Sequence, residues 1–307
     1  MDNNALILVT GANGFLGTWL VGYLLDKGFS VRAAVRDVGK GRHLLQKYAD
    51  FDSRLKLAFV PDMEKHGAYH EAVKSVDAII HTASPVHLDA KDPKVVFTSS
   101  CAAILDSSST SASVSEKDWN DARVEQCANL GADAEPLAKY AASKVLAEKS
   151  VWTFVEEHKF ALKWDLVVIN PPYMFGSLNS STRMWYGAVA EGHYFGGSPL
   201  TSPGHGWVDV RDIADAHIRA LAVPDAGWER IIISAGSWVW QDWVNTVYAL
   251  PSSVCPGFPR AEAPEEIQTR YITFDGSKQE RILGLKLRSM EESATDILEN
   301  YVALGLL

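Results

Sequence analysis

The sequence predicts an α/β protein: a doubly wound parallel β-sheet with a smaller C-terminal lobe. Two features indicate this fold class. Short apolar runs alternate with helical patterns through the first half of the chain, which is typical of a parallel sheet with helices on both faces. After Pro172 the alternation stops, and glycine, proline and aromatic residues dominate as far as Trp207.

The expected strands are short runs rich in Val, Ile and Leu, and the expected helices place apolar side chains three and four residues apart. In chain order, we expect strands at Leu6–Val9, Val31–Val35, Leu55–Val60, Val76–His81, Val95–Thr98, Leu166–Ile169 and Ile231–Ser234. We expect helices at Phe15–Lys27, Gly39–Tyr48, His70–Val73, Tyr140–His158, Val210–Ala222 and Met290–Leu304. The serine-rich segment Ser107–Ser115 predicts a surface loop.

The chain has 307 residues, of which 47% are hydrophobic and 22% charged, as in an ordinary globular protein. This length allows one large domain or two closely joined ones. We expect residues 1–170, with about 207–235, to form the sheet domain. Residues 171–206 and 236–307 would form the lobe that binds a substrate.

Composition also limits the classes of function. The net charge of −9 argues against nucleic-acid binding. The apolar runs are far shorter than a membrane span, and residues 1–9 lack the pattern of a secretory signal. Cys101, Cys127 and Cys255 show neither paired nor metal-ligand spacing, so we expect no metal site and a cytoplasmic location.

A glycine-rich turn, Thr-Gly-Ala-Asn-Gly-Phe-Leu-Gly at residues 10–17, joins the first strand to the first helix. A turn in this context forms the phosphate-binding element of a Rossmann-like domain. Glycine lets the backbone approach a pyrophosphate, which the N–H groups and dipole of the helix start then hold. A glycine triplet alone is more often a plain turn, but its spacing and position favour dinucleotide binding. The residues expected to bind are Gly11, Asn13, Gly14, Phe15, Leu16 and Gly17.

Tyr140 and Lys144 are four residues apart in the long expected helix, so their side chains project from one face. A phenol with a pKa of about 10 is a poor acid at neutral pH, and a nearby ammonium ion lowers that pKa. The pair therefore predicts a tyrosine that acts as a general acid. Such pairs also occur by chance on solvated helices, and only together with the glycine turn does this one indicate catalysis.

The segment Thr98-Ser99-Ser100 follows the fifth expected strand. Open α/β sheets bind ligands outside the carboxyl ends of their strands. A serine hydroxyl there can donate a hydrogen bond to a substrate oxygen as charge develops on it. The alternative is a plain strand-to-loop turn, which serine also favours.

In these motifs the chain resembles the extended short-chain dehydrogenase/reductases, the superfamily that includes the NAD-dependent epimerase/dehydratase family. It is most similar to the dihydroflavonol-reductase-like group, with its fungal ketoreductases and methylglyoxal reductases. The resemblance runs through the whole chain, in Thr10–Gly17, Val35–Asp37, Val60–Met63, Ile80–Pro85, Phe97–Ser100, Asp118–Asn120, Tyr140–Lys144, Asn170–Gly176, Val208–Asp212 with His217, and Leu283-Gly284.

The resemblance implies NADP(H)-dependent reduction of a ketone or aldehyde. Tyr140 would protonate the carbonyl oxygen, and Lys144 would assist it and hold the nicotinamide ribose. Ser100, with Ser99 as the alternative, would orient the carbonyl group. The other residues that the resemblance places around the cofactor are Thr82, Ala83, Ser84, Pro171, Tyr173, Asp62 and Met63.

Basic residues near the end of the second strand favour NADPH over NADH. Arg36 ends that strand, with Arg32 before it and Lys40 after it. A guanidinium suits a 2′-phosphate, whereas NAD enzymes place an acidic residue here to bind the ribose 2′-OH. Asp37 could serve NAD in that way, and Arg32 and Lys40 could be plain surface charges. We expect NADP(H), bound by Arg36 and Lys40.

Aromatic residues after the sixth strand are the candidates for a substrate pocket, although each is also a candidate for ordinary core. They are Tyr173, Phe175, Met184, Trp185, Tyr186 and Trp207. Because the sequence offers no charged clamp for a nucleotide sugar or coenzyme A, we expect a small, fairly apolar carbonyl substrate. The alternatives are a non-catalytic NADP-binding sensor or inactive isoform, and a sterol-type dehydrogenase/isomerase or sugar-nucleotide epimerase. We expect a monomer or weak homodimer without membrane or nucleic-acid partners.

The connection between the fourth and fifth expected strands is unusually short. Only Pro85–Pro93 separates Ser84 from Lys94, whereas parallel neighbours need a crossover of about a dozen residues or more, usually a helix. The resemblance implies a helix here, so the chain has an apparent internal deletion, either a true variant or a splicing or gene-model fault. We expect poor cover of the sheet at this point, with lower stability and activity than in relatives.

Overall fold

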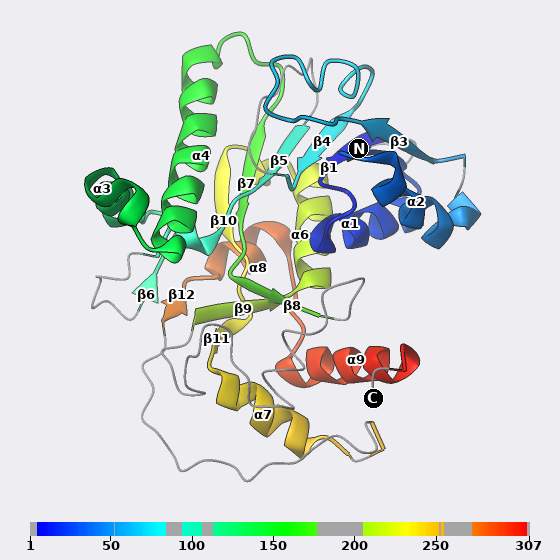
Figure 1. Ribbon diagram of the computed structural model, residues 1–307, viewed down its shortest axis with the longest axis vertical. Helices are drawn as coiled ribbons and strands as arrows, with labels where there is room; N and C mark the ends of the chain where they lie inside the picture. The colour runs from blue at the N-terminus through cyan, green and yellow to red at the C-terminus, as the bar shows by residue number, and fades with distance from the viewer. Residues whose placement is uncertain are drawn as a thin grey trace.

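Seven parallel strands form the central sheet of the computed structural model (Figure 1). Their order is β10-β7-β5-β4-β1-β2-β3, so the chain builds outward from β1 to β3, returns to β4 and builds outward on the other side. This arrangement confirms the predicted Rossmann-like, doubly wound sheet. The strands are β1 (Leu6–Thr10), β2 (Ser30–Val35), β3 (Leu55–Phe59), β4 (Ala78–His81), β5 (Lys94–Thr98), β7 (Leu166–Asn170) and β10 (Glu229–Ile232).

The structure describes residues 5–51, 53–83, 94–105, 113–176, 205–251, 253–254 and 272–305. Within these ranges, no helix combines the length and the apolar character that a bilayer crossing requires. The residues with an expected role that lie outside the described ranges are Ser84, Met184, Trp185, Tyr186 and Cys255.

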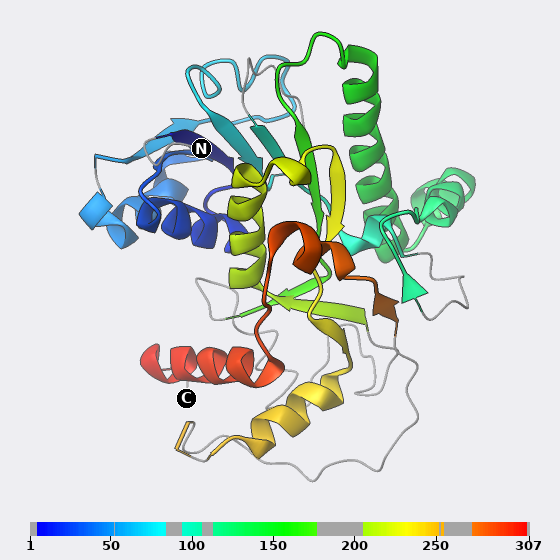
Figure 2. The ribbon, with the colours of Figure 1, turned by 180° about the vertical axis from the view of Figure 1, so that it is seen from behind.

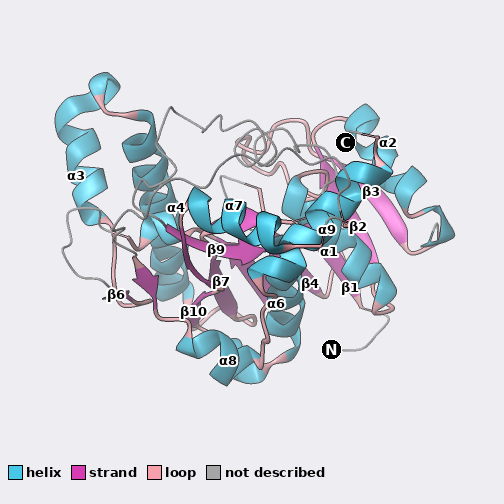
Figure 3. Ribbon diagram, turned by 90° about the horizontal axis from the view of Figure 1, so that it is seen from below, coloured by secondary structure: helices cyan, strands magenta, loops and turns pink. Residues whose placement is uncertain are grey.

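Helices cover both faces of the sheet (Figure 3). On one face α1 (Phe15–Asp26) packs beside α6 (Val210–Ala222). On the other lies α4 (Pro136–His158), with α3 (Asp121–Leu130) packed against it. The other described helices are α2 (Val38–Lys47), α7 (Trp240–Ala249), α8 (Ser277–Leu283) and α9 (Met290–Ala303), with 3₁₀ turns at Ala49–Phe51, Cys101–Ala103, Gly131–Asp133 and Pro224–Ala226.

The hydrophobic core differs between the two faces of the sheet. Beneath α1 and α6, one continuous cluster extends across all seven strands, from Leu55 on β3 to Ile231 on β10. On the opposite face the described buried side chains form separate clusters: one includes Ile79, another, under α4, includes Val95, and a third includes Ile232 of β10. Ile79 and Val95 are register partners on adjacent strands, so this face of the core divides between β4 and β5.

That division coincides with the short connection expected from the sequence. β4 and β5 are parallel neighbours joined by residues 82–93, of which 84–93 lie outside the described ranges. The apparent deletion and the resulting loss of stability stay predictions. The divided core marks the place where a crossover helix would add apolar contacts.

The C-terminal lobe consists of β8 (Tyr173–Phe175), β9 (His205–Asp209), β11 (Gly236–Trp238), α7 and α9, below the sheet in Figure 1. β9 is central, parallel to β8 and antiparallel to β11. Aromatic side chains dominate its core because the tryptophan-rich segment packs inward. They are Phe175, Trp207, Trp238, Trp243 and Tyr301. A short parallel pair, β6 (Ser113–Val114) with β12 (Thr273–Phe274), lies nearby.

Helix α8 lies late in the chain but packs against α6 and β10 (Figure 2). Leu283 and Leu285 join the continuous core beneath α1 and α6. The chain therefore returns to the sheet domain after residue 236, and the expected domain boundaries stay a prediction.

Two expected elements are wrong. Residues His70–Val73 form hydrogen-bonded turns instead of a helix, in a segment bounded on both sides by left-handed backbone at Gly67 (φ 75°) and Ser75 (φ 58°), where a helix cannot continue. The expected loop Ser107–Ser115 contains the strand Ser113–Val114, which is too short to show a periodic pattern, and residues 106–112 lie outside the described ranges.

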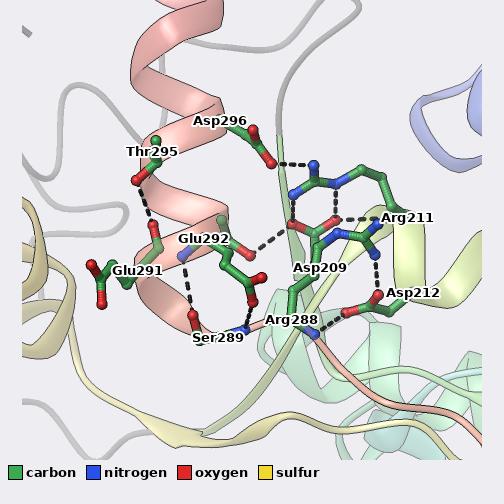
Figure 4. Close-up of polar contacts among 10 residues, drawn as sticks. Asp209, Arg211, Asp212, Arg288, Ser289, Glu291, Glu292, Thr295 and Asp296 are labelled. Carbon is green, nitrogen blue, oxygen red and sulfur yellow. Dashed lines mark hydrogen bonds and ion pairs between the residues drawn. The ribbon is translucent and has the colours of Figure 1, made fainter. Parts of the chain in front are cut away.

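A charged network joins the start of α6 to α9 (Figure 4). Asp209 is the N-cap residue of α6, and its carboxylate accepts from the Arg211 backbone N–H at 2.9 Å. The Arg211 guanidinium bonds both Asp209 and, on α9, Asp296. Asp212 accepts from the backbone and side chain of Arg288. The network fixes the lobe against the end of the sheet domain that faces it.

Candidate functional site

A cavity of about 500 Å³ lies at the carboxyl ends of the central strands. Open α/β sheets bind their ligands at this position, where the strand order reverses. We call it the cofactor cavity. Its described walls comprise Gly11, Asn13, Gly14, Phe15, Leu16, Gly17, Ala34, Val35, Arg36, Val60, Met63, Tyr69, Thr82, Ala83, Thr98, Ser99, Ser100, Tyr140, Lys144, Pro171, Pro172 and Met174.

The glycine turn is built so closely that side chains would not fit. Gly11 has φ 65°, and a Cβ on it would lie 2.8 Å from Thr82 Oγ1. A Cβ on Gly17 would lie 2.2 Å from the Gly11 carbonyl oxygen. Gly14 is the N-cap of α1 and offers no side-chain cap, so the first N–H groups of α1 remain for a ligand in the cavity.

Hydrogen bonds join the end of β4 to this turn. Thr82 Oγ1 donates to the Thr10 carbonyl oxygen at 2.7 Å, and the Ala83 N–H donates to Thr10 Oγ1 at 3.3 Å. The buried His81 ring lies 3.0 Å from the same hydroxyl. These contacts fix the two cavity-lining segments after β1 and β4 in one arrangement.

Arg36 lines the cofactor cavity at the end of β2, as the sequence predicts. No acidic side chain is among the described residues of the cavity wall. Asp37, the candidate acid for NAD binding, caps α2 instead, since its Oδ1 accepts from the Lys40 N–H at 3.1 Å. The charge around this end of the cavity therefore suits a phosphate better than a ribose 2′-OH.

Other charged residues near this end have local structural roles. Arg32 donates to the carbonyl oxygens of Ala72 and Lys74 at 2.8 and 2.6 Å. Asp62 accepts from the Glu64 N–H at 3.0 Å in a local turn. Neither Asp62 nor Lys40 is among the described residues of the cavity wall.

The two serines after β5 have different surroundings. Ser99 is buried, and its hydroxyl donates to Glu148 at 2.6 Å. Ser100 Oγ accepts from the Ala102 N–H at 3.1 Å, which leaves its O–H available as a donor. The geometry favours Ser100 over Ser99 as the serine that binds a substrate oxygen.

Tyr140 and Lys144 lie one turn apart on α4 and both line the cofactor cavity. The Lys144 ammonium lies 5.8 Å from the centre of the Tyr140 ring. Tyr140 is 48% exposed, so its phenol is accessible from the cavity. Burial lowers the pKa of Lys144, and the negative charge of Glu148 opposes this effect.

Behind Thr98, another wall residue, lies the fully buried His217. Its Nδ1 lies 2.7 Å from the Ile213 carbonyl oxygen, and its Nε2 lies 2.7 Å from Thr98 Oγ1. We assign the proton to Nδ1, so that Nε2 accepts from the threonine. Burial lowers the pKa of His217 to about 4, which keeps the ring neutral at pH 7.

A second cavity, of about 350 Å³, adjoins the first and is mainly apolar. We call it the substrate cavity. It is lined by Ser100, Cys101, Ala102, Leu105, Asn120, Arg123, Leu137, Tyr140, Ala141, Pro172, Tyr173, His205 and Phe274.

Three titratable groups in the substrate cavity have shifted pKa values. Burial lowers the pKa of His205, whereas burial and the nearby Tyr140 raise that of Tyr173. The Cys101 thiol donates to the Asn170 carbonyl oxygen at 3.2 Å. Burial, reinforced by nearby carboxylates, raises the pKa of this thiol well above its usual value. All three groups are therefore held in their neutral forms at pH 7.

The structure brings most of the predicted residues together. Tyr173 lines the substrate cavity instead of the cofactor cavity. Phe175 and Trp207, candidates for the substrate pocket, belong to the buried core of the lobe. The wall residues that the sequence analysis did not predict are Ala34, Val35, Val60, Tyr69, Pro172 and Met174. Several of them end or follow strands, and strand-end position is the signal that could have indicated them.

Comparison with known proteins shows the family to which the chain belongs. A model of the NAD dependent epimerase/dehydratase family matches residues 7–236. The ketoreductase azaE of Aspergillus niger is 30% identical, over 96% of this chain and 97% of the relative. Aldehyde reductase 2 of Sporidiobolus salmonicolor is also 30% identical, over 99% and 98%.

Solved structures agree with these matches. The crystal structure of Gre2 from Candida albicans in complex with NADPH superimposes with a TM-score of 0.81 at 27% identity, covering 97% of this chain and 99% of that one. One conclusion follows from the family-model match over more than half of the chain, the relatives matched over nearly their whole length and the shared fold. The chain belongs to the NAD-dependent epimerase/dehydratase family.

Proposed function

We propose that the chain is an NADPH-dependent reductase that converts a ketone or aldehyde to an alcohol. One observation carries this proposal: Ser100, Tyr140 and Pro172 line both the cofactor cavity and the substrate cavity. A carbonyl group bound where the two cavities meet would contact a hydroxyl donor and a phenol together. Both relatives at 30% identity are named as reductases, which supports the reaction type.

The cofactor cavity fits NADPH. Gly11 packs closely against Thr82, and Gly17 against the Gly11 carbonyl, which keeps the turn tight at the start of α1. The first N–H groups of α1, which Gly14 leaves without a side-chain cap, would bind the pyrophosphate. Arg36 would bind the 2′-phosphate. When bound, NADPH supplies a hydride. The other residues proposed to hold it are Asn13, Gly14, Phe15, Leu16, Met63, Thr82, Ala83, Pro171 and Lys144.

The chain's own residues would handle the carbonyl oxygen. Ser100 would donate its O–H to that oxygen and orient it. Tyr140 would transfer its phenolic proton to the same oxygen as the carbonyl carbon is reduced. The Lys144 ammonium would stabilise the phenolate that remains. Together these steps give a neutral alcohol before the product leaves the site.

The substrate cavity suits a small, largely apolar carbonyl compound. Its volume of about 350 Å³ is at the lower end for small-molecule sites, and Leu105, Leu137 and Phe274 form much of its apolar lining. A sugar nucleotide is a poor match for this lining, which favours a reductase over an epimerase on the same fold.

Spectrophotometric turnover of NADPH and NADH with a panel of small ketones, diketones and aldehydes tests the proposal. The wild-type protein should consume NADPH, and Tyr140→Phe should lose most of the turnover while still binding NADPH by fluorescence titration. Tyr248→Phe, on α7 in the lobe, is the matched control and should retain activity. Unchanged turnover in Tyr140→Phe refutes the proposed acid. NADPH binding without any turnover by the wild type favours the non-catalytic sensor.

The assembly and location also remain proposals: a monomer or weak homodimer in the cytoplasm. Light scattering over a range of protein concentrations, and imaging of a tagged chain, would check them.

A further inference from the structure

Glu148 is a fully buried carboxylate on α4, one helical turn after Lys144. The proposed mechanism does not use it. Its Oε2 accepts from Ser99 Oγ at 2.6 Å and from Asn170 Nδ2 at 2.9 Å. Its Oε1 accepts from Arg230 Nε at 2.5 Å. The carboxyl ends of β5 and β7 and Arg230 of β10 therefore meet at one carboxylate on the helix that carries Tyr140.

The residues bound by Glu148 are direct neighbours of site residues. Ser99 precedes Ser100, and the Asn170 amide also donates to the Ser100 carbonyl oxygen at 3.3 Å. Asn170 precedes Pro171, a wall residue of the cofactor cavity. A shift of Glu148 would therefore move the Ser100 hydroxyl relative to Tyr140.

Stability alone does not explain a buried ion pair at this position. Well-packed apolar residues at such a site are often as stabilising or more so, because burying two charges is costly. Arg230 is further held by the carbonyl oxygens of Glu116 and Asp118, at 2.5 and 3.1 Å, and its guanidinium lies 3.7 Å from the centre of the Trp119 ring. So many contacts around one pair indicate a requirement for defined geometry and charge.

We propose that Glu148 is a positioning residue: its carboxylate fixes the ends of β5 and β7 against α4 and keeps Lys144 cationic beside Tyr140. This inference rests on the proposed function, because it acts through the roles assigned there to Ser100 and Lys144.

The charged and titratable neighbours set the direction of the electrostatic effect. Glu148 faces Arg230 from β10 and the Cys101 thiol after β5, and the Glu116 carboxylate also acts on that thiol. Lys144 faces Tyr140 on its own helix and Glu148 below, and Tyr173 from β8 faces Tyr140. Removing the Glu148 charge should lower the pKa of Lys144. Removing the Arg230 charge leaves the negative charge of Glu148 uncompensated and should raise the pKa of Lys144.

The test is the pH dependence of kcat in two variants with opposite expected shifts. In Glu148→Gln the alkaline limb should move to lower pH, and kcat should fall about tenfold or more. In Arg230→Gln the limb should move to higher pH. Glu148→Asp keeps the charge and should restore the wild-type limb with a reduced kcat. Glu156→Gln, an exposed glutamate on the same helix, is the matched control and should change nothing.

If Glu148 has only a structural role, Glu148→Gln should lower the melting temperature and leave the alkaline limb in place, or the limb should move in the same direction in Glu148→Gln and Arg230→Gln. Either result overturns the proposal. If Glu148→Gln does not fold, the Arg230→Gln and Glu148→Asp profiles decide the question. Tyr140→Phe is assayed alongside. Full activity in that variant overturns the proposed function and this inference together, whereas its inactivity with an unmoved limb in Glu148→Gln overturns this inference alone.

Discussion

Arg211 binds both carboxylate oxygens of Asp209: its Nε donates to Oδ1 at 2.8 Å and its Nη2 to Oδ2 at 2.7 Å. Asp209 is fully buried at the start of α6, and Ser293 of α9 donates to the same carboxylate at 2.7 Å. Two planar groups matched in this way form the strongest kind of ion pair in proteins. The pair connects the sheet domain to the lobe that supplies Tyr173 and His205 to the substrate cavity.

Replacing Arg211 by methionine should therefore destabilise the protein by about 3–5 kcal/mol, because Asp209 would remain as a buried charge without its cation. Urea unfolding followed by circular dichroism measures this loss. Lys159→Met removes an exposed pair with Glu156 and should cost less than about 1 kcal/mol. Equal losses in the two variants would contradict the assignment of a strong buried pair.

The buried His217 should make stability depend on pH. Its pKa is lowered to about 4 in the folded protein and returns to about 6.5 on unfolding, so the unfolded chain binds a proton first as pH falls. The contribution is complete above pH about 6.5 and should decrease by up to about 3 kcal/mol as the pH falls to about 4. In His217→Gln this dependence should be absent. Urea unfolding at several pH values measures this dependence, with the exposed His158→Gln as control. If stability depends on pH in His217→Gln as it does in the wild type, the assignment to His217 is wrong.

Arg36 should control cofactor choice. Loss of one charged contact to a phosphate costs about 1.5–3 kcal/mol, so Arg36→Ala should weaken NADPH binding about 10- to 100-fold and affect NADH little. Fluorescence titration with both cofactors measures the ratio. Arg42→Ala, an exposed arginine on α2 outside the described cavity wall, should leave the ratio unchanged. An equal loss for NADPH and NADH in Arg36→Ala would argue against a 2′-phosphate contact.

The divided core between β4 and β5 should limit stability. The alignment with the ketoreductase spans 342 positions, longer than this chain of 307 residues, so parts of that relative have no counterpart here. A chimera in which the ketoreductase's β4–β5 connection replaces residues 84–93 should melt at a higher temperature and with a sharper transition, because a crossover helix would bury apolar area there. An unchanged melting curve would show that the short connection covers the sheet adequately.

The sheet and the glycine turn could be predicted from sequence because each depends on local features. The runs around Val9 and Val35 are apolar and short, and Gly17 is required by a contact within its own turn. Polar residues whose side chains bond to protein groups instead of facing a ligand are harder to predict. Asp37 serves as a helix cap although its neighbour Arg36 lines the cavity, and Ser99 lies in the cavity wall but donates its hydroxyl to Glu148.

Glu148 itself escaped prediction for a related reason. On the core face of α4 a glutamate breaks the apolar pattern, and only the tertiary fold brings Arg230, 82 positions later, to its side. The aromatic residues Phe175 and Trp207 illustrate the opposite error. Aromatic composition does not distinguish the lining of a pocket from the core of a lobe, since both need large apolar side chains.

The Cys101 thiol has a chemical consequence for a pocket that receives carbonyl compounds. Aldehydes and conjugated ketones are electrophiles, and the thiolate is the form of cysteine that attacks them. Because Cys101 lines the substrate cavity with its thiol held neutral and bonded to Asn170, the protein carries a nucleophile next to its site in an inert form. We therefore expect Cys101 to react slowly with electrophilic carbonyl compounds that enter the cavity.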